Sequence, residues 1–162
     1  MNRRLRAQSG FSLIEGMIAA VVLALGLLAL SGIQAISFGG NVDAKELTRV
    51  TNMAADMVER IQFNRRNVAV YNNIDTQNPG TQPPASQTMA RGDYAQWQAM
   101  LNASSLTNVR GLVAVAAIGP TAPFPLNQNS VAVTITWTGA ASGGSKVARN
   151  RSVTLTAVVA PE

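Results

Sequence analysis

The sequence predicts an α+β fold in which a long amino-terminal helix, half of it embedded in a membrane, packs on a small antiparallel β-sheet head. Three observations predict it. Residues 11–38 are apolar almost without interruption and contain a single charged side chain, Glu15. Apolar residues then recur at helical spacing as far as Ile61. Towards the carboxyl end, apolar and polar residues alternate, as they do in strands with one buried face.

The composition argues against an enzyme or a metalloprotein. The chain has no His and no Cys, which removes the commonest general base and the usual zinc ligands. We therefore expect no catalytic residue, no metal site and no cofactor. The formal net charge is +5, but the first ten residues supply three of the 13 basic side chains, so the remainder carries ten basic and eight acidic side chains. That excess is too small to predict nucleic acid as a partner.

The amino-terminal segment divides into a leader and a membrane helix. Residues 1–10, MNRRLRAQSG, are short and basic and end in Gly10. Their three arginines are expected to stay in the cytoplasm, so that the chain beyond residue 38 faces outward. As a helix, residues 11–38 measure about 42 Å, more than the roughly 30 Å of a bilayer core. Fourteen of them are Leu, Ile, Val or Phe. At about 0.3–0.6 kcal/mol each, these outweigh the roughly 3 kcal/mol that Glu15 costs in lipid.

Two simpler interpretations of this segment compete. In a secretory signal peptide, cleavage would fall after a weak site ending at Ala35, but the apolar region of such a peptide has 7–15 residues and contains no acid. A plain membrane anchor explains the length but gives Glu15 no role. An acidic residue within a spanning helix is by default a functional hypothesis, for which a partner has to be named.

Residues 10–15, GFSLIE, resemble the type IV prepilin signature. The resemblance implies that a dedicated prepilin peptidase cuts between Gly10 and Phe11 and methylates the new amino terminus at Phe11. It also implies that Glu15 meets the amino terminus of an adjacent subunit during filament assembly. The residue types suit this chemistry, because a cationic amine buried among apolar helices is tolerable only when it is paired with an anion.

Glycines interrupt the apolar helix at several points. Many members of this family place a proline here, and this chain has none before Pro79. We expect Gly26 and Gly32 to serve as hinges where the helix unwinds locally when the subunit leaves the lipid. The alternative is that these glycines serve close helix packing, since glycine is common in membrane helices.

The helical pattern continues through residues 39–66 as an amphipathic segment, giving one helix from about residue 11 to residue 64. Its core-facing residues are predicted to be Leu47, Val50, Met53, Ala54, Met57, Val58 and Ile61. Two pairs, Glu46 with Arg49 and Asp56 with Arg60, have the spacing of ion pairs on a helix surface.

Residues 67–162 are predicted to form the globular head. Residues 68–92 are read as a variable loop, either a partner-binding surface or plain disorder, because they contain several turn formers. A short helix over residues 93–102 is expected to be capped by Asp93 and to bury Trp97.

Strands are predicted at residues 112–118, 131–138 and 152–159, within a carboxyl-terminal antiparallel sheet over residues 110–160. Residues 140–144 should form a flexible hairpin loop. Arg149 and Arg151 are expected to solvate the start of the last strand or to form a basic contact surface.

Several stretches further resemble the PilV branch of minor pilins: residues 51–61, the helix with Trp97, and the strand that ends at Trp137. This resemblance implies a single-pass inner-membrane protein with a periplasmic head that later enters the pilus. It would prime pilus assembly with other minor pilins and the major pilin and would sit at the tip, with a tip adhesin as a further candidate partner.

Two alternatives remain open at this point. One is the I-type pseudopilin of a type II secretion system, which shares the motif and the layout. The other is a minor pilin that takes up DNA, which would bind nucleic acid through a patch of arginines. The candidates for that patch are Arg65, Arg66, Arg149 and Arg151.

Overall fold

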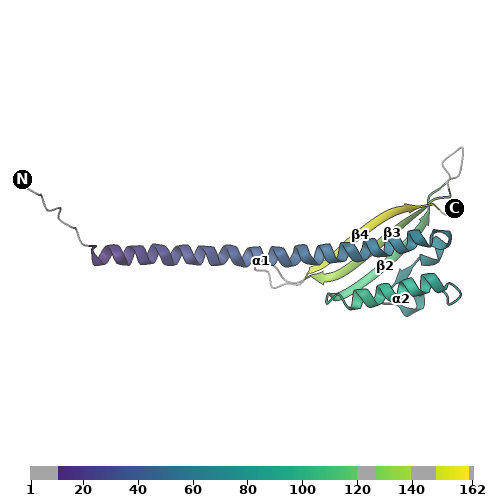
Figure 1. Ribbon diagram of the computed structural model, residues 1–162, viewed down its shortest axis with the longest axis horizontal. Coiled ribbons are helices and arrows are strands. Elements are labelled where there is room, and N and C mark those ends of the chain that lie inside the picture. The colour runs from purple at the N-terminus through teal and green to yellow at the C-terminus, as the bar shows by residue number, and fades with distance from the viewer. Residues whose placement is uncertain (1–10, 120–126, 140–148, 161–162) are drawn as a thin grey trace, which may run out of the picture.

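The computed structural model describes residues 11–119, 127–139 and 149–160. It confirms the predicted α+β architecture. Helix α1 (Leu13–Phe63) is a single rod of 51 residues. Figure 1 shows that its amino-terminal half projects alone, while its carboxyl half lies along the head. The leader and the predicted hairpin loop at 140–144 lie outside the described residues.

The head follows α1 in chain order and ends in a sheet. Its elements are the 3₁₀ helix η1 (Arg65–Tyr71), strand β1 (Ile74–Asp75), the 3₁₀ helix η2 (Pro79–Thr81), helix α2 (Thr88–Asn102) and strands β2 (Thr107–Ala117), β3 (Asn129–Gly139) and β4 (Arg149–Val159). The strands lie in the order β1-β2-β3-β4, and every neighbouring pair is antiparallel. The sheet is therefore a meander, with the long β4 at one edge.

One face of the sheet packs on α1, as the alternation in the sequence predicts. On β3, Val131, Val133, Ile135 and Trp137 are buried, while the residues between them are half-buried on the other face. From α1, the buried side chains are those of Val50, Met53, Ala54, Met57 and Ile61. These positions recur every three or four residues and so form one stripe of the helix. This stripe against β3 and β4 makes the core of the head.

Two predicted features of this stripe are wrong. Leu47 lies one turn before Val50, at the edge of the head nearest the apolar half of α1, and is 50% exposed. Glu46 does not pair with Arg49. Its carboxylate instead accepts a hydrogen bond from the indole N–H of Trp137 at 3.1 Å. Tertiary partners win because a local pair on a helix surface is worth only about 0.2–0.5 kcal/mol.

The arginines of the two predicted ion pairs in α1 behave differently. Arg49 donates to the backbone carbonyl of Ser104, which follows α2. The predicted pair of Arg60 with Asp56 is confirmed, with 2.6 Å between Nε and Oδ2. The same guanidinium reaches across to Asp93 on α2 at 3.4 Å. Arg60 thus joins the carboxyl end of α1 to α2.

The predicted loop at 68–92 contains more structure than expected. It includes part of η1, all of β1 and η2, and the first turn of α2, which begins at Thr88 rather than at residue 93. The amphipathic helix also ends earlier than predicted, at Phe63, so that Arg65 and Arg66 belong to η1. Short elements of this kind carry little periodicity, and their pairing depends on distant partners.

Asp93 is not the cap of α2 but lies inside the helix. Its carboxylate accepts a hydrogen bond from the Tyr71 hydroxyl at 2.5 Å, and that hydroxyl accepts one from the side-chain amide of Asn64 at 3.0 Å. Burial, together with the bond to Asp93, raises the pKa of the Tyr71 phenol well above its ordinary value. The hydroxyl therefore stays protonated and can donate. This network joins the end of α1 to α2 through η1.

Trp97 occupies the centre of the head, as predicted. It is fully buried, and its indole N–H donates to the Met53 carbonyl of α1 at 2.9 Å. Strand β2 crosses the ring at Gly111, where a Cβ atom would lie 2.6 Å from Cζ3 of Trp97 and 2.8 Å from Cδ1 of Leu101. Only glycine fits between β2 and α2 at this point.

Candidate functional site

The amino terminus of α1 begins with a side-chain cap that the sequence analysis did not identify. The Ser12 hydroxyl accepts a hydrogen bond from the Glu15 backbone N–H at 3.3 Å. The Ser12 carbonyl accepts from the backbone N–H groups of Glu15 and Gly16 at 3.1 and 3.2 Å. Ser followed three residues later by Glu is the spacing of a capping box, and that spacing was the available signal. The cap fixes the start of the helix at Leu13.

The predicted cut lies just outside this capped helix. Phe11 precedes the cap, is not helical, and is 79% exposed. Gly10, the other residue of the predicted scissile bond, lies outside the described residues. A protease binds its substrate with the backbone extended around the bond that is cut. Because Ser12 caps the start of the helix, Phe11 can adopt an extended conformation. Cleavage before Phe11 therefore does not require α1 to unwind.

Glu15 stands in the first turn of α1, where the helix dipole favours an anion. Its side chain is exposed, and no hydrogen bond or ion pair joins its carboxylate to any other residue of the described ranges. The backbone at Glu15 is fixed by the cap, but the carboxylate remains available to a cation.

The first half of α1 is an apolar cylinder without a cover. Every large apolar side chain from Phe11 to Phe38 is more than half exposed, the values running from 55% to 85%. The segment is long and apolar enough to cross a membrane, with a mean hydropathy of 2.5 in its most apolar window. A cylinder that is apolar on all sides is stable in lipid or among other apolar helices, but not in water.

The predicted hinge glycines do not bend the helix in this structure. Helix α1 is continuous through Gly26 and Gly32. A Cβ atom at either position would meet nothing within 4 Å, so no close contact within the chain requires glycine there. Their role as hinges stays a prediction about the helix after it leaves the membrane.

The base of the head is fixed to α1 by two long-range polar contacts. Arg151 of β4 pairs with Asp43 at 3.0 Å, and one turn later Glu46 accepts the bond from Trp137. A Cβ atom on Gly139 would lie 2.7 Å from Cδ of Arg151, so this glycine leaves room for the arginine side chain. Arg151 therefore anchors the sheet and does not solvate a strand start, whereas Arg149 is exposed, as predicted.

The four arginines considered for nucleic-acid binding do not form one patch. Arg65 and Arg66 follow the end of α1, whereas Arg151 contacts Asp43, twenty residues before that end. At 1.5 Å per helical residue, the two pairs are separated by about 30 Å along the head. Arg151 is also neutralised by Asp43. This placement removes the basis for a continuous basic surface.

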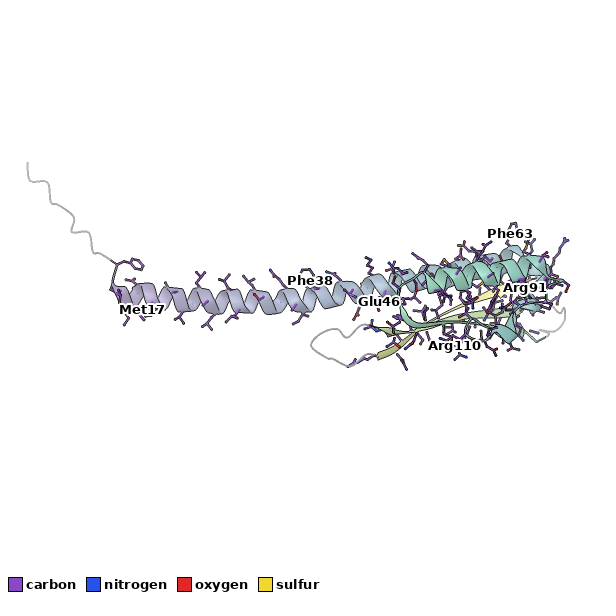
Figure 2. All side chains as sticks on the ribbon, turned by 90° about the horizontal axis from the view of Figure 1, so that it is seen from below. Met17, Phe38, Glu46, Phe63, Arg91 and Arg110 are labelled. Atoms are coloured by element: carbon purple, nitrogen blue, oxygen red, sulfur yellow. The ribbon has the colours of Figure 1, made fainter. Side chains whose placement is uncertain are left out.

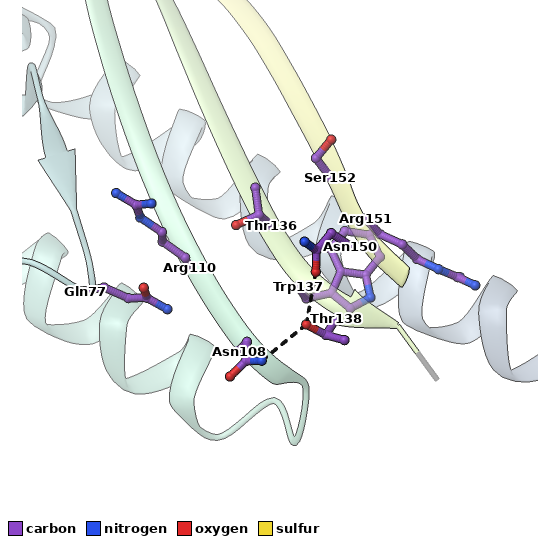
Figure 3. A pocket seen from close by; sticks show the side chains of 9 residues that line it. All are labelled: Gln77, Asn108, Arg110, Thr136, Trp137, Thr138, Asn150, Arg151 and Ser152. Atoms are coloured by element: carbon purple, nitrogen blue, oxygen red, sulfur yellow. Dashed lines mark hydrogen bonds between the residues drawn. The ribbon is translucent and has the colours of Figure 1, made fainter. Parts of the chain in front are cut away.

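A polar hollow lies on the outer face of the sheet, lined by residues of β2, β3 and β4 (Figure 3). Asn108 donates to the Thr138 hydroxyl at 3.3 Å, and Thr138 donates to Asn150 at 3.4 Å. Arg110 is held by both carboxylate oxygens of Asp75 at 2.9 and 2.6 Å. These groups satisfy one another, and the hollow contains no nucleophile with an adjacent base. Within the described residues, no cluster of three or more acidic side chains could hold a metal ion.

Comparison with known proteins bears on the amino terminus. Residues 5–31 match the family described as the prokaryotic N-terminal methylation motif. No curated protein and no solved structure matches the chain. The match spans Gly10, Phe11 and Glu15 and indicates a type IV pilin-like or pseudopilin-like prepilin that is processed by a prepilin peptidase. The long helix on an antiparallel sheet is the architecture of such proteins, and the apolar helix fits membrane anchoring.

Proposed function

We propose that this chain is a minor type IV pilin of the PilV kind, a non-enzymatic subunit that helps to prime pilus assembly and sits at the pilus tip. The observation that carries this proposal is the carboxylate of Glu15, unpaired in the described structure, in the capped first turn of an uncovered apolar helix. Such a carboxylate is costly in lipid and of no use to a simple anchor.

Processing creates the partner that Glu15 lacks. Cleavage between Gly10 and Phe11 leaves a cationic amine on Phe11, which the prepilin peptidase then methylates. Within a bundle of apolar helices, the amine of one subunit and the Glu15 carboxylate of its neighbour neutralise each other. Because each charge is unfavourable in lipid alone, their pairing favours transfer of the helix from the bilayer into the filament base.

Before assembly, the subunit is expected to reside in the inner membrane with its head in the periplasm. Support for the PilV assignment comes from the resemblance of residues 51–61, of helix α2 with Trp97, and of the part of strand β3 that leads to Trp137. These are the parts that join the head to α1. The expected partners are other minor pilins, the major pilin and a candidate tip adhesin.

Deletion of the gene in its host tests this assignment against the pseudopilin alternative. We expect loss of surface pili and unchanged secretion of enzymes into the medium. Complementation with the wild-type chain should restore pili, and complementation with Glu15→Ala should not, although the leader is still removed. Normal pili together with a loss of secreted enzymes would contradict the pilus assignment and favour the pseudopilin.

A further inference from the structure

Strand β4 forms an open edge of the sheet. It ends the strand order β1-β2-β3-β4, so within the described residues only β3 pairs with it. Its 11 residues match β3 in an unbroken register from Arg149 to Val159. In an edge strand of an antiparallel sheet, about half of the backbone N–H and C=O groups point away from the neighbouring strand. Those of β4 therefore face outward along the whole edge.

This edge lacks the features by which proteins keep open edges from pairing. Those features include short strands, prolines, bulges and charged side chains. Residues 152–159 of β4 contain no charged side chain and no proline, and their register with β3 has no bulge. The opposite edge differs, because β1 has only two residues and its Asp75 is paired with Arg110. A long, uncharged edge such as β4 is the form of edge that an added strand extends.

The apolar core is incomplete beside this edge. Figure 2 shows the helices on one face of the sheet, while Arg110 lies towards the other face. On the face that packs on α1, Val133 and Ile135 of β3 are fully buried. Their cross-strand neighbours on β4, Leu155 and Val153, point to the same face but are only half-buried. The side chains of β4 are less covered because no described strand lies beyond them.

Helix α1 provides an apolar wall beside the same edge. Its contacts with α2 come from one flank of the buried stripe, at Arg49 and Arg60. At 3.6 residues per turn, Leu47 and Val58 lie on the opposite flank, away from α2. Leu47 lines a hollow together with Arg151 of β4, which places this flank over the edge strand. Leu47 and Val58, both partly exposed, therefore lie beside the outward-facing backbone of β4.

We propose that β4 accepts an extended strand from another protein of the pilus, which lengthens the sheet by one strand. The backbone of the incoming strand pairs with the outward-facing N–H and C=O groups of β4. Every second side chain of that strand is apolar and lies against Leu155 of β4 and Val58 of α1. The side chains between them are polar and continue the outer surface formed by Thr154 and Thr156. Backbone pairing supplies the affinity, and the alternating, uncharged pattern supplies the specificity.

The partner is a different chain and not a second copy. Strand β4 begins beside Asp43, near the apolar half of α1, and runs towards the carboxyl end of α1 (Figure 1). A second copy paired antiparallel through its own β4 would point its apolar half in the opposite direction, away from the shared membrane. Pairing of β4 with the opposite edge of a second copy would repeat without closing, which a tip subunit does not do. The contact rests on the part of the proposed function in which this chain assembles with other pilus proteins.

Hydrogen exchange tests this contact directly, because it reports on the backbone amides of β4 themselves. The full-length protein is purified in detergent from cells that contain the prepilin peptidase. It is expressed once alone and once together with the other minor pilins, the major pilin and the candidate tip adhesin of its host. In the protein alone, we expect about half of the amides in residues 152–159 to exchange rapidly. In the complex they should slow by roughly tenfold or more, whereas the amides of β3 are protected in both samples.

Two lysine substitutions on β4 separate edge pairing from a general effect of charge. Ala157→Lys places a cation on the core-facing side of the edge, where it reaches water in the free protein but becomes buried beside an added strand. Thr156→Lys is the matched control, because residue 156 is exposed on the outer face and stays in water in both states. We expect Ala157→Lys to lose the co-purified partner and the added protection, and Thr156→Lys to retain both. The Tm of each variant alone reports whether the head is folded, and the wild-type exchange result stands without either variant.

Three results would overturn the contact. They are β4 amides that exchange equally fast in both samples, a complex that survives Ala157→Lys in a folded variant, and protection that appears in the protein alone as its concentration is raised. The last result would identify a second copy as the occupant. If deletion of the gene abolishes pili while β4 stays unprotected, the contact fails and the proposed function stands. If a co-expressed protein protects β4 with the lysine pattern but deletion leaves pili intact, the proposed function fails and the contact stands.

Discussion

Gly111→Ala should destabilise the head by overpacking its centre. The added Cβ would lie 2.6 Å from Cζ3 of Trp97 and 2.8 Å from Cδ1 of Leu101. Ordinary carbon contacts are about 3.5–4.0 Å long, so the strand and the ring must separate by about 1 Å. Neither moves freely. Trp97 is held by its hydrogen bond to the Met53 carbonyl. The Gly111 backbone N–H donates to the Thr76 hydroxyl at 2.8 Å, and the Gly111 carbonyl accepts from the Thr76 backbone N–H at 3.0 Å.

The expected loss of unfolding free energy is about 1–3 kcal/mol, the usual range for overpacking a buried site. For a head of this size, such a loss lowers Tm by about 4–12 °C. The assay is thermal unfolding of the full-length protein in detergent, followed by tryptophan fluorescence. Both tryptophans, Trp97 and Trp137, lie in the head, so the signal ignores the membrane helix.

Gly92→Ala is the matched control for this substitution. Gly92 lies inside α2, and a Cβ atom there meets nothing within 4 Å. Alanine in a helix is favoured over glycine by about 0.5–1 kcal/mol, so this variant should be more stable than the wild type. If Gly111→Ala matched the wild type in Tm, or if both variants shifted Tm in the same direction, the packing of β2 on Trp97 would be wrong.

Three further predictions concern polar groups. Tyr71→Phe should lower the free energy of unfolding by about 1–3 kcal/mol in denaturant titration, since it removes the hydrogen bond to the Asp93 carboxylate; an unchanged midpoint would disprove that bond. The hydrogen bonds from Arg110 lower the pKa of Asp75, so they stabilise the head above the ordinary pKa of about 3.9, and this stability is lost as the pH falls through the folded value. Arg110→Met should therefore reduce the fall in Tm seen on acidification below about pH 4, and an identical pH profile would contradict the pair. Glu15→Ala should leave leader removal intact, as judged by gel mobility, but exclude the subunit from sheared pili; normal incorporation would refute the role of Glu15.

The sequence was sufficient to predict the elements whose periodic pattern extends over many residues. The fourteen Leu, Ile, Val and Phe residues among residues 11–38 and the stripe from Val50 to Ile61 predicted α1, and strict alternation predicted β3 and β4. Helix α2 was found through Trp97, but its start was placed five residues late, because Asp93 looks like a cap and is used instead to bind Tyr71.

The parts that the sequence did not reveal depend on partners far away in the chain. Strand β1 has only two residues and pairs with β2 across more than thirty residues. The contact of Asp43 with Arg151 joins residues more than a hundred positions apart. No local pattern encodes such a pairing, because it arises only once the sheet has packed on α1. Ser12 was the exception, since the cap could have been predicted from its spacing to Glu15.

The central claim is that this chain is cut before Phe11 and then enters a filament through its new amino terminus. The most direct test is the intact mass and amino-terminal peptide of the protein purified from host membranes or pili. We predict a chain that starts at Phe11 and carries one added methyl group on that residue. A protein that keeps its first ten residues, or that begins near Ile36, would contradict the account.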